Sequence, residues 1–426
     1  MKFIENIELT EYEEFVEKNE YKSHFLQSSM WGEFSSIDKG LIPHYVGLKE
    51  NGKLVCATLL LEKKLVFGYS YFYAPRGYVI NFEDFNLLKI FTNELKKYVK
   101  KHKGIFIKID PDIIIKKYNY KNEEIIVKTN IFENLQKLGY KHLGFTQRFE
   151  TTQPRFSFRI DFNQPLEQVE EHFSKTTKQR IKKASELDIS VSLARDINDF
   201  YNLMDITENR KGFITHNKKY YEDLYNIFNK KNKCNIFLGS VDIDKIIFKN
   251  NSNITALENE IKKIKTIDNL SKSMKTKLNE LEKRKEKLIN DNIKYQEEKE
   301  KYGNNIILSA HFIVEYGDKA WVLYAGNHDI LSYTYANYKT YFEHIKYYYN
   351  KGIKIYDQFG TVGKLKENDS LLGLHEFKKK FGGDYVEFIG EFDLITNKLM
   401  YFLFKKLVPF YRKRKFKQNI KKNVNL

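Results

Sequence analysis

The amino-acid sequence predicts an α/β protein built from two related units, the second of which carries an inserted hairpin of two helices. Three observations support this fold class. A strand–helix–strand pattern occurs twice, a segment over 245–302 has the composition of a helical arm, and 426 residues with 42% hydrophobic content exceed what one ordinary core needs. The chain is therefore expected to form two or three globular parts.

The repeated pattern consists of a strand, an amphipathic helix followed by glycine, and a second strand that ends in aspartate. The helical stretch is NLLKIFTNELKKYVKKHKG in the first copy and YKTYFEHIKYYYNKG in the second. Each glycine is expected to cap the C-terminus of its helix. The shared order of elements indicates a duplicated unit, marked by Tyr73, Gly104 and Asp110 in the first copy and by Tyr324, Gly352 and Asp357 in the second.

The segment 245–302 lacks Gly, Pro and Trp, and its apolar residues follow the 3,4 spacing of a helix that packs along one face. The spacing slips at DNLSKS, residues 268–273, where Asp, Asn and Ser disfavour a helix. We therefore expect an antiparallel coiled-coil arm. The strand-like stretches NIFLGSVDI and IILSAHFIVEY flank it, so the arm is expected to be inserted in a β-hairpin. A spacer and a dimerisation coil are the alternatives for this pattern.

The charge of the chain indicates a polyanionic partner. Lys+Arg number 73 and Asp+Glu 56, a net charge of +17, which favours nucleic acid, phosphorylated substrates or an anionic membrane. The codon bias of an AT-rich genome is the alternative explanation. One basic segment is the predicted helix TTKQRIKKA, whose polyanion-binding residues are expected to be Lys175, Lys178, Arg180, Lys182 and Lys183. A solvated charged helix is the alternative there.

The C-terminal segment is the second basic region. No acidic residue follows Asp393, and nine Lys/Arg lie between Lys405 and Lys422 among aromatic and aliphatic residues. This mixture suits an anionic lipid surface, with RNA phosphate as the rival partner. We therefore expect this tail to hold the protein at a membrane surface.

Several kinds of chemistry lack their sequence signals. Cys56 and Cys234 form no CxxC pair, the histidines show no HxxH spacing, and no Walker loop, dinucleotide fingerprint or G-x-S-x-G elbow is present. No metal or cofactor is therefore expected. The N-terminus lacks a basic start followed by an apolar stretch, and no window of 18 uncharged apolar residues occurs. A cytoplasmic location is expected.

The repeated units resemble the acyltransferase fold of the GNAT type, which holds the CoA pyrophosphate on a loop of pattern Q/R-x-x-G-x-G/A. The nearest match, 136–141, fails at its last position. The resemblance without this loop implies a different acyl donor.

Eight segments in order resemble the FemABX peptidyltransferases, which use aminoacyl-tRNA to add amino acids to the peptide of a peptidoglycan precursor. The resemblance covers nearly the whole chain, and the arm resembles the tRNA-binding arm of seryl-tRNA synthetase. The segments are FLQSSMWGEF, YAPRG, KIDPDI, TTKQRIKKA, ENRKGFITHNKKYYEDLY, LYAGN, ANYKTYFEHIKYYYNKGIKIYDQFG and LHEFKKKFGGDYVEFIGEFDL.

The resemblance implies a division of the chain and roles for single residues. It implies a first GNAT-like unit over 1–153 plus 390–426, a second over 154–389, and the arm over 245–302 within the second. Lys378 is implied to stabilise charge on the ester during attack. Independently of the resemblance, Asp110, or alternatively Asp357, each at the end of a predicted strand, is expected to accept the amine proton. Implied substrate contacts are Lys39, Tyr73, Arg76, His216, Tyr220, Tyr324 and Phe377.

Two positions depart from the family pattern. His216 stands where the family tends to have an arginine for the phosphates of the precursor, and Ser35 replaces the lysine that is usual at the fourth position after Trp31. Lys39 is the expected stand-in for that lysine. The recognition of the precursor is therefore the part of the site in which this chain differs most from the family.

The function that the resemblance implies is transfer of an amino acid from aminoacyl-tRNA to an amine on the stem peptide, with lipid II or UDP-MurNAc-pentapeptide as acceptor. The reaction is expected at the inner face of the cell membrane. Two alternatives belong to other classes, a non-catalytic RNA-binding coiled-coil protein and a CoA-dependent N-acyltransferase. The missing CoA loop disfavours the latter.

Overall fold

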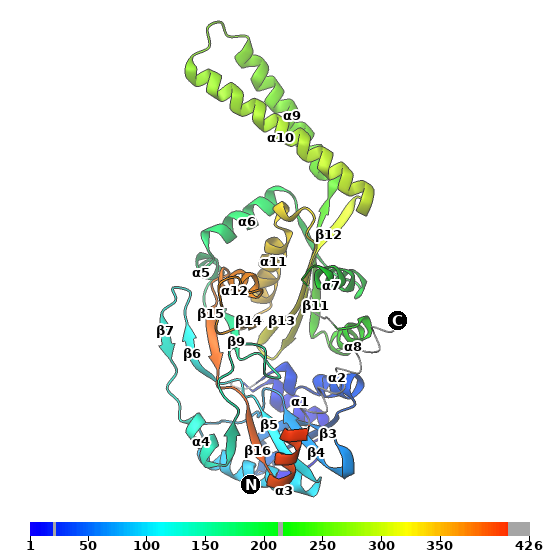
Figure 1. The fold of residues 1–426 in the computed structure, drawn as a ribbon, viewed down its shortest axis with the longest axis vertical. Coiled ribbons are helices and arrows are strands. Elements are labelled where there is room, and N and C mark those ends of the chain that lie inside the picture. Colours follow the sequence, from blue (N-terminus) through cyan, green and yellow to red (C-terminus); the bar gives the residue numbers. More distant parts are fainter. Residues whose placement is uncertain (20–22, 212–215, 408–426) are drawn as a thin grey trace.

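The computed structural model describes residues 1–19, 23–211 and 216–407. It contains two mixed β-sheets, each covered by helices, and a long helical arm (Figure 1). The first sheet has the order β1-β2-β3-β4-β5-β16-β8. Its strands are β1 (Lys2–Ile4), β2 (Ile42–Glu50), β3 (Lys53–Lys64), β4 (Ser70–Ala74), β5 (Gly104–Ile109), β8 (Tyr140–His142) and β16 (Phe392–Ile395).

The helices of the first sheet include the amphipathic helix predicted in the first repeat. This helix, α3, has Asp84 as its N-cap and buries Leu88, Phe91 and Leu95 against the sheet, between the parallel strands β4 and β5. The helices are α1 (Leu9–Glu17), α2 (Ser29–Lys39), α3 (Phe85–Lys101), α4 (Ile131–Lys137) and helical residues 398–407, with the 3₁₀ turns η1 (Phe25–Gln27) and η2 (Val66–Gly68).

The second sheet has the order β10-β11-β12-β13-β14-β9-β15-β6-β7. Strands β13 and β14 are parallel, and α11 lies between them in the sequence, as the second repeat predicts. The strands are β6 (Ile114–Tyr118), β7 (Glu124–Ile126), β9 (Phe156–Asp161), β10 (Ser190–Leu193), β11 (Cys234–Asp242), β12 (Asn305–Tyr316), β13 (Lys319–Asn327), β14 (Ile355–Thr361) and β15 (Asp384–Phe388). The helices are α5 (Leu166–Glu171), α6 (Lys175–Glu186), α7 (Asn198–Lys211), α8 (Lys218–Asn229), α11 (Ala336–Asn350) and α12 (Leu372–Lys379), with the 3₁₀ turn η3 (Ser332–Thr334).

The two glycines that were predicted to cap helices have different roles in the structure. Gly352 has φ +85° and follows α11, as a C-terminal cap does. The prediction for Gly104 was wrong, because Gly104 is the first residue of β5 and the positive φ of +51° belongs to Lys103. A Cβ at Gly104 would meet Val99 Cγ1 at 2.3 Å. This glycine therefore allows the close approach of α3 to β5.

Within the residues that the structure describes, the chain crosses between the two sheets four times, from β5 to β6, from β7 to β8, from β8 to β9 and from β15 to β16. β16 pairs with β5 and β8 in the first sheet, although it follows the second unit in sequence. Conversely, β6 and β7 extend the second sheet, although they lie within 1–153. The division into 1–153 plus 390–426 and 154–389 stays a prediction, and sheet membership favours assigning 114–126 to the second unit.

The arm consists of α9 (Ile243–Lys265) and α10 (Lys272–Tyr302), which connect the paired strands β11 and β12. The two helices run antiparallel away from the body (Figure 1). Ion pairs join them at Lys265–Glu282 and Lys277–Glu260, both 2.7 Å, and Leu257, Ile261 and Ile264 are buried between them. At the root, Ile246 and Tyr295 belong to a cluster in the body. The arm therefore adds little to the cores of the sheets beyond its root.

Replacing 252–290 with a short Gly–Ser loop is expected to leave a protein that unfolds cooperatively, because the root residues stay in place and the two sheets are complete without the arm. Thermal unfolding followed by circular dichroism measures this. As a control, Tyr295→Ala in the full chain removes a buried ring and should cost about 3 kcal/mol of unfolding free energy. Loss of a cooperative transition in the shortened protein would contradict the insertion.

Candidate active site

A cavity of about 1140 Å³ lies between the two sheets. The first unit contributes α2, β3, β4 and β5 to its wall, and the second contributes α8, β13 and β14. Five of the predicted substrate residues line it: Lys39, Tyr73, His216, Tyr220 and Tyr324. Ser35, which replaces the family's lysine, also lines it and is buried. A cavity of this size accommodates a large ligand.

An aromatic cluster forms the wall between α2 and α8. The hydroxyls of Tyr220 and Tyr324 are 2.9 Å apart, and the His216 ring stacks on Tyr220 with centroids 3.6 Å apart. Burial raises the pKa of Tyr220 to about 12. Burial and the nearby Lys39 ammonium lower the pKa of His216. His216 is therefore neutral near pH 7, and Lys39 provides the positive charge at this end of the cavity.

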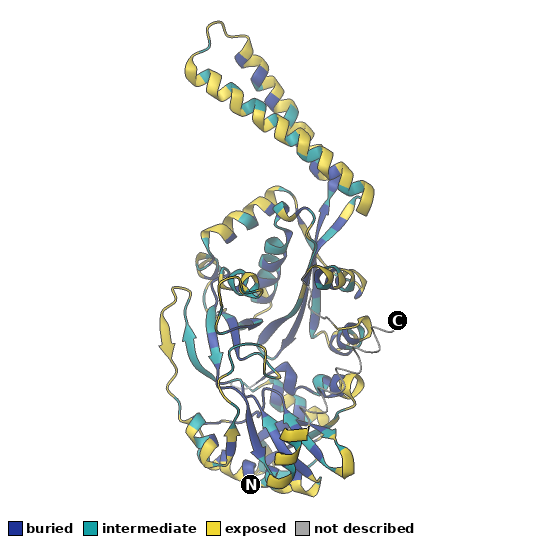
Figure 2. Ribbon diagram, viewed as in Figure 1, coloured by how far each residue is buried: buried dark blue, intermediate teal, exposed yellow. Residues whose placement is uncertain are grey.

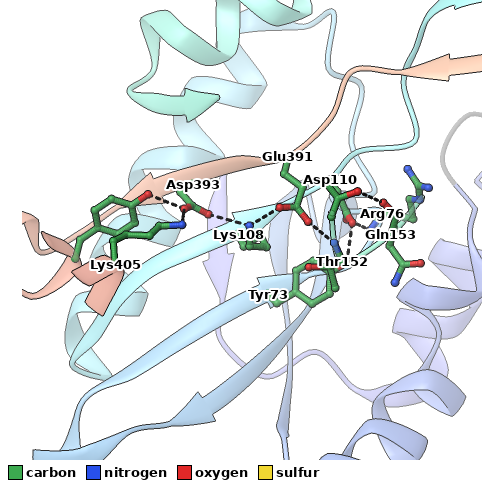
Figure 3. Close-up of polar contacts among 11 residues, drawn as sticks. Tyr73, Arg76, Lys108, Asp110, Thr152, Gln153, Glu391, Asp393 and Lys405 are labelled. Carbon is green, nitrogen blue, oxygen red and sulfur yellow. Dashed lines mark hydrogen bonds and ion pairs between the residues drawn. The ribbon is translucent and has the colours of Figure 1, made fainter. Parts of the chain in front are cut away.

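Asp110 follows β5 and lies behind the cavity wall. Its carboxylate accepts hydrogen bonds of 2.7 Å from the Tyr73 hydroxyl and from the Arg76 backbone N–H (Figure 3). Burial raises the pKa of Asp110 to about 6, although the charge of Arg76 and the hydrogen bond from Tyr73 oppose this shift. Asp110 therefore contacts the cavity through Tyr73.

Arg76 occupies a separate position from the other substrate residues. Its side chain is buried, donates to the Pro154 carbonyl at 2.6 Å and lies over the Phe388 ring at 4.4 Å. It lines a smaller cavity that shares Pro154 and Phe359 with the large one. The structure thus does not place Arg76 on the wall of the large cavity.

A chain of charges continues along the first sheet and was not predicted. Lys108 forms ion pairs with Glu391 at 2.6 Å and Asp393 at 3.5 Å, and Asp393 also pairs with Lys405 at 3.0 Å (Figure 3). Glu391 accepts from Thr152 N at 2.6 Å. The i, i+2 spacing of Lys108 and Asp110 indicated a shared strand face. No local sequence pattern places Glu391 and Asp393 beside Lys108, although the resemblance implies that 390–426 returns to the first unit.

Lys378 lies on α12 and is buried. Its ammonium donates to the carbonyls of Phe359 at 2.8 Å and Gly360 at 2.7 Å. Burial lowers the pKa of Lys378 to about 7, while the Asp357 carboxylate acts in the opposite direction. Because Phe359 lines the large cavity, Lys378 is connected to the cavity wall through one carbonyl.

Two further predicted site residues, the substrate contact Phe377 and the alternative proton acceptor Asp357, are engaged by other parts of the protein. Phe377 packs against Tyr338, Tyr341 and Phe381, with centroids 5.1–5.2 Å apart, and does not line the large cavity. Asp357 accepts from Arg159 Nε and from Phe359 N, both at 2.7 Å. Both candidate proton acceptors therefore contact a cavity residue, Asp357 through the backbone N–H of Phe359 and Asp110 through the side-chain hydroxyl of Tyr73, and only the hydroxyl can relay a proton.

The predicted RNA-binding residues lie on α6. Lys175, Lys178, Lys182 and Lys183 are exposed, whereas Arg180 is half-buried over the rings of Tyr335 and Tyr338. Lys183 also lines a cavity of about 370 Å³ between α6 and α10, which adds cations that the sequence analysis missed: Arg284, Lys287 and Lys294. α6 and the base of the arm thus form one basic surface.

The remaining sequence predictions concern metals and the membrane. In the ranges that the structure describes, no three His, Cys, Asp or Glu side chains gather as metal ligands do, and no helix is both long and apolar enough to cross a membrane. The basic tail lies outside the described residues from 408 onward, apart from Lys405 and Lys406, which are exposed.

Comparisons with known proteins agree with this architecture. The chain is 27% identical to the lipid II:glycine glycyltransferase of Staphylococcus haemolyticus, covering 97% of each protein. It is 28% identical to the aminoacyltransferase FemA of Staphylococcus epidermidis, covering 96% of this chain and 99% of the relative. The crystal structure of FemX superposes with a TM-score of 0.78 at 25% identity, covering 95% and 99% of the two chains. The predicted fold class is confirmed.

A sequence model of the FemAB family matches residues 7–408. This match covers the first sheet apart from β1, the second sheet and the arm, so it does not depend on one motif. The chain belongs to the FemAB family.

Proposed function

We propose that this protein transfers an amino acid from aminoacyl-tRNA to an amine of the stem peptide of lipid II. The enzyme class, an aminoacyltransferase, and the broader role in building the peptide bridge of peptidoglycan are supported by the family and by the relatives. The observation that carries the finer proposal is the cavity, whose wall joins five implied substrate residues from both units.

The acceptor fits the cavity by charge and by shape. Lys39 and Lys63 line it and supply cations for the phosphates of a precursor, whereas the lysines at 108 and 405 also line it but are paired with Glu391 and Asp393. The paired hydroxyls of Tyr220 and Tyr324 offer donors and acceptors to a peptide or sugar. Lys39 thus takes the place of the cation that Ser35 and His216 do not provide.

The attacking amine must lose a proton as the amide bond forms and the ester bond to the tRNA breaks. In the proposed step, the amine gives its proton to the Tyr73 oxygen while the Tyr73 hydroxyl proton moves to Asp110, which already accepts it at 2.7 Å. The same proton then returns from Asp110 through Tyr73 to the ribose oxygen of the tRNA, which leaves as a hydroxyl, so that Asp110 and Tyr73 end the step as they began it. An aminoacyl ester is already activated, so positioning of the amine supplies much of the rate.

Lys378 is proposed to stabilise the oxygen that becomes negative during attack. An ammonium has three N–H donors, and the carbonyls of Phe359 and Gly360 use two of them. The third is left for the substrate. Because burial leaves few competing waters, a fixed cation there has a large effect on the transition state.

The tRNA is proposed to lie along α6 and the base of α10. Lys183 of α6 lines the cavity of about 370 Å³ together with three cations and the single acid Asp291 of α10, and the other lysines of α6 are exposed beside it. RNA phosphates bind surfaces on which cations outnumber acids in this way. The basic tail is proposed to hold the enzyme at the inner, anionic face of the membrane. The donated amino acid depends on the pocket and the tRNA and is not specified by this charge pattern.

Incubation with charged tRNA and lipid II or UDP-MurNAc-pentapeptide is expected to give a muropeptide heavier by one amino-acid residue. Mass spectrometry of the product measures this. Omitting the tRNA should abolish the product, and acetyl-CoA should not replace it. Acetyl transfer without tRNA would establish a CoA-dependent acyltransferase, whereas tRNA binding without any product would favour the RNA-binding protein.

Lys378→Met is expected to lower turnover by at least about 100-fold, because it removes the proposed transition-state donor. The free energy of unfolding should fall by no more than about 2–6 kcal/mol, because two buried carbonyls each lose a donor at a cost of about 1–3 kcal/mol. Single-turnover transfer and thermal unfolding measure the two effects. The neighbouring exposed Lys379→Met is the matched control, and Lys378→Arg should restore activity only in part. Transfer at the parental rate by Lys378→Met would refute this role.

The plot of transfer rate against pH is expected to be bell-shaped. It should rise as the pH passes about 6, where Asp110 loses its proton and can accept another, and fall as the pH passes about 7, where Lys378 loses its charge. Initial rates with saturating substrates measure the profile. In Lys378→Arg the alkaline fall should disappear, because arginine keeps its charge. An unchanged alkaline fall in that variant would assign it to another group.

A further inference from the structure

Exposed apolar side chains gather at one end of the first sheet, from two segments far apart in sequence. Phe67 in the turn η2 is 89% exposed, the highest value for a large apolar residue in the described ranges, and Val66 is 74% exposed. The helix 398–407 also presents apolar residues to solvent and is mostly exposed in Figure 2. We call this surface the apolar end face, made of Val66, Phe67, Leu399, Phe402, Leu403 and Leu407.

A buried cluster holds the two segments together. Phe106 lies at its centre, the Tyr71 ring stacks on it at 5.4 Å, and Phe404 packs at 5.3 Å. Leu65 and Tyr69, on either side of η2, pack on the same cluster as Tyr401, whose hydroxyl donates to Asp393 at 2.7 Å. The exposed side chains therefore belong to a fixed surface of the folded body.

The charges around the apolar end face are positive. Lys64, Lys103, Lys398, Lys405 and Lys406 are exposed, and Ser70, which follows η2, donates its N–H to the Lys103 carbonyl at 3.3 Å. The nearby acids Glu62 and Asp393 are buried and paired with lysines. A second copy of the same face would bring like charges together. An anionic bilayer matches both the apolar residues and the lysines.

We propose that the apolar end face inserts into the headgroup region of an anionic bilayer, with Phe67 and Phe402 as its main anchors. The face adjoins the large cavity, because Tyr71, Phe404 and Lys405 line that cavity. A lipid-linked acceptor could then keep its chain in the bilayer while its headgroup enters the cavity. This last step rests on the proposed function, whereas the insertion of the face does not.

Fluorescence of Phe67→Trp tests the insertion directly. The chain has two other tryptophans, and Trp321 is buried while Trp31 lines the cavity, so the new residue reports on η2. Vesicles of equal parts phosphatidylglycerol and phosphatidylcholine should shift its emission to the blue, and lipids brominated on their chains should quench it. Pure phosphatidylcholine should give a smaller shift. Unchanged emission with anionic vesicles would overturn the proposal.

The double variant Phe67→Ser/Phe402→Ser should lower the partition coefficient for the same anionic vesicles by at least about tenfold, since two apolar anchors are lost. Vesicle sedimentation measures this. The control is Phe248→Ser, which removes a 75% exposed ring from α9. Native-like binding by the double variant, with loss of binding after removal of 412–426, would assign docking to the tail alone and overturn the proposal. Self-association of the native protein that the double variant abolishes would also overturn the proposal.

A separate measurement keeps this inference distinct from the proposed function. Transfer to soluble UDP-MurNAc-pentapeptide by the double variant is expected to match the native protein, because neither phenylalanine lines the cavity. Vesicle insertion without any transfer would leave the apolar end face established and the proposed function refuted. Amino-acid transfer without vesicle insertion would support the proposed function and refute the insertion of the apolar end face.

Discussion

The ion pairs of Arg159 with Asp112 and Asp357 are the interaction on which the site depends. Arg159 on β9 donates to Asp112, just beyond the first sheet, at 2.8 Å and to Asp357 on β14 at 2.7 Å. Although burial alone would raise it, the guanidinium holds the pKa of Asp112 well below its usual range. Breaking a buried pair of this kind costs about 3–5 kcal/mol. The pairs therefore fix the first sheet against the second where the large cavity meets the smaller one lined by Arg76.

The proposed proton acceptor Asp110 and the proposed charge-stabilising residue Lys378 are both held in place by residues of this ion-pair cluster. Asp112 follows Asp110 by two residues, so the pairing that fixes one also fixes the acceptor of the Tyr73 proton. Asp357 accepts from Phe359 N, and the Phe359 and Gly360 carbonyls hold Lys378. Asp110 and Lys378 lack a full countercharge in direct contact, and burial brings both pKa values near neutrality. Paired charges give rigidity here, and unpaired ones give reactivity.

Much of the fold could be predicted from sequence, because its signals are local. Helix periodicity and the break at 268–273 located the arm, whose connection the structure places at 266–271. The repeat located the parallel strand pairs. Gly104 was misjudged because a glycine after a helix serves equally as a cap or as a close contact, and only packing distinguishes these. The sheet membership of β6, β7 and β16 depends on long-range pairing that no local pattern encodes.

The site was predictable to a similar degree and for the same reason. The family resemblance led to Lys39, Tyr73, His216, Tyr220 and Tyr324, which the fold brings to one cavity. It implied that 390–426 belongs to the first unit, but it named neither Glu391 nor Asp393 as a site residue, and these pair with Lys108 where β16 lies beside β5. Val66 and Phe67 carried no signal either, since two apolar residues beside a glycine look like the end of a buried strand. Their exposure is a property of the folded turn.

The apolar end face and the basic surface of α6 and α10 lie at opposite ends of the body. The apolar end face and the helix 398–407, red in Figure 1, lie at the end of the body opposite the arm. The large cavity lies between the two sheets, and the basic surface of α6 and α10 lies on the side of the arm. A membrane at one end and an RNA at the other would therefore not compete for space. Under the proposed function, the lipid-linked amine and the tRNA ester would approach the cavity from opposite sides.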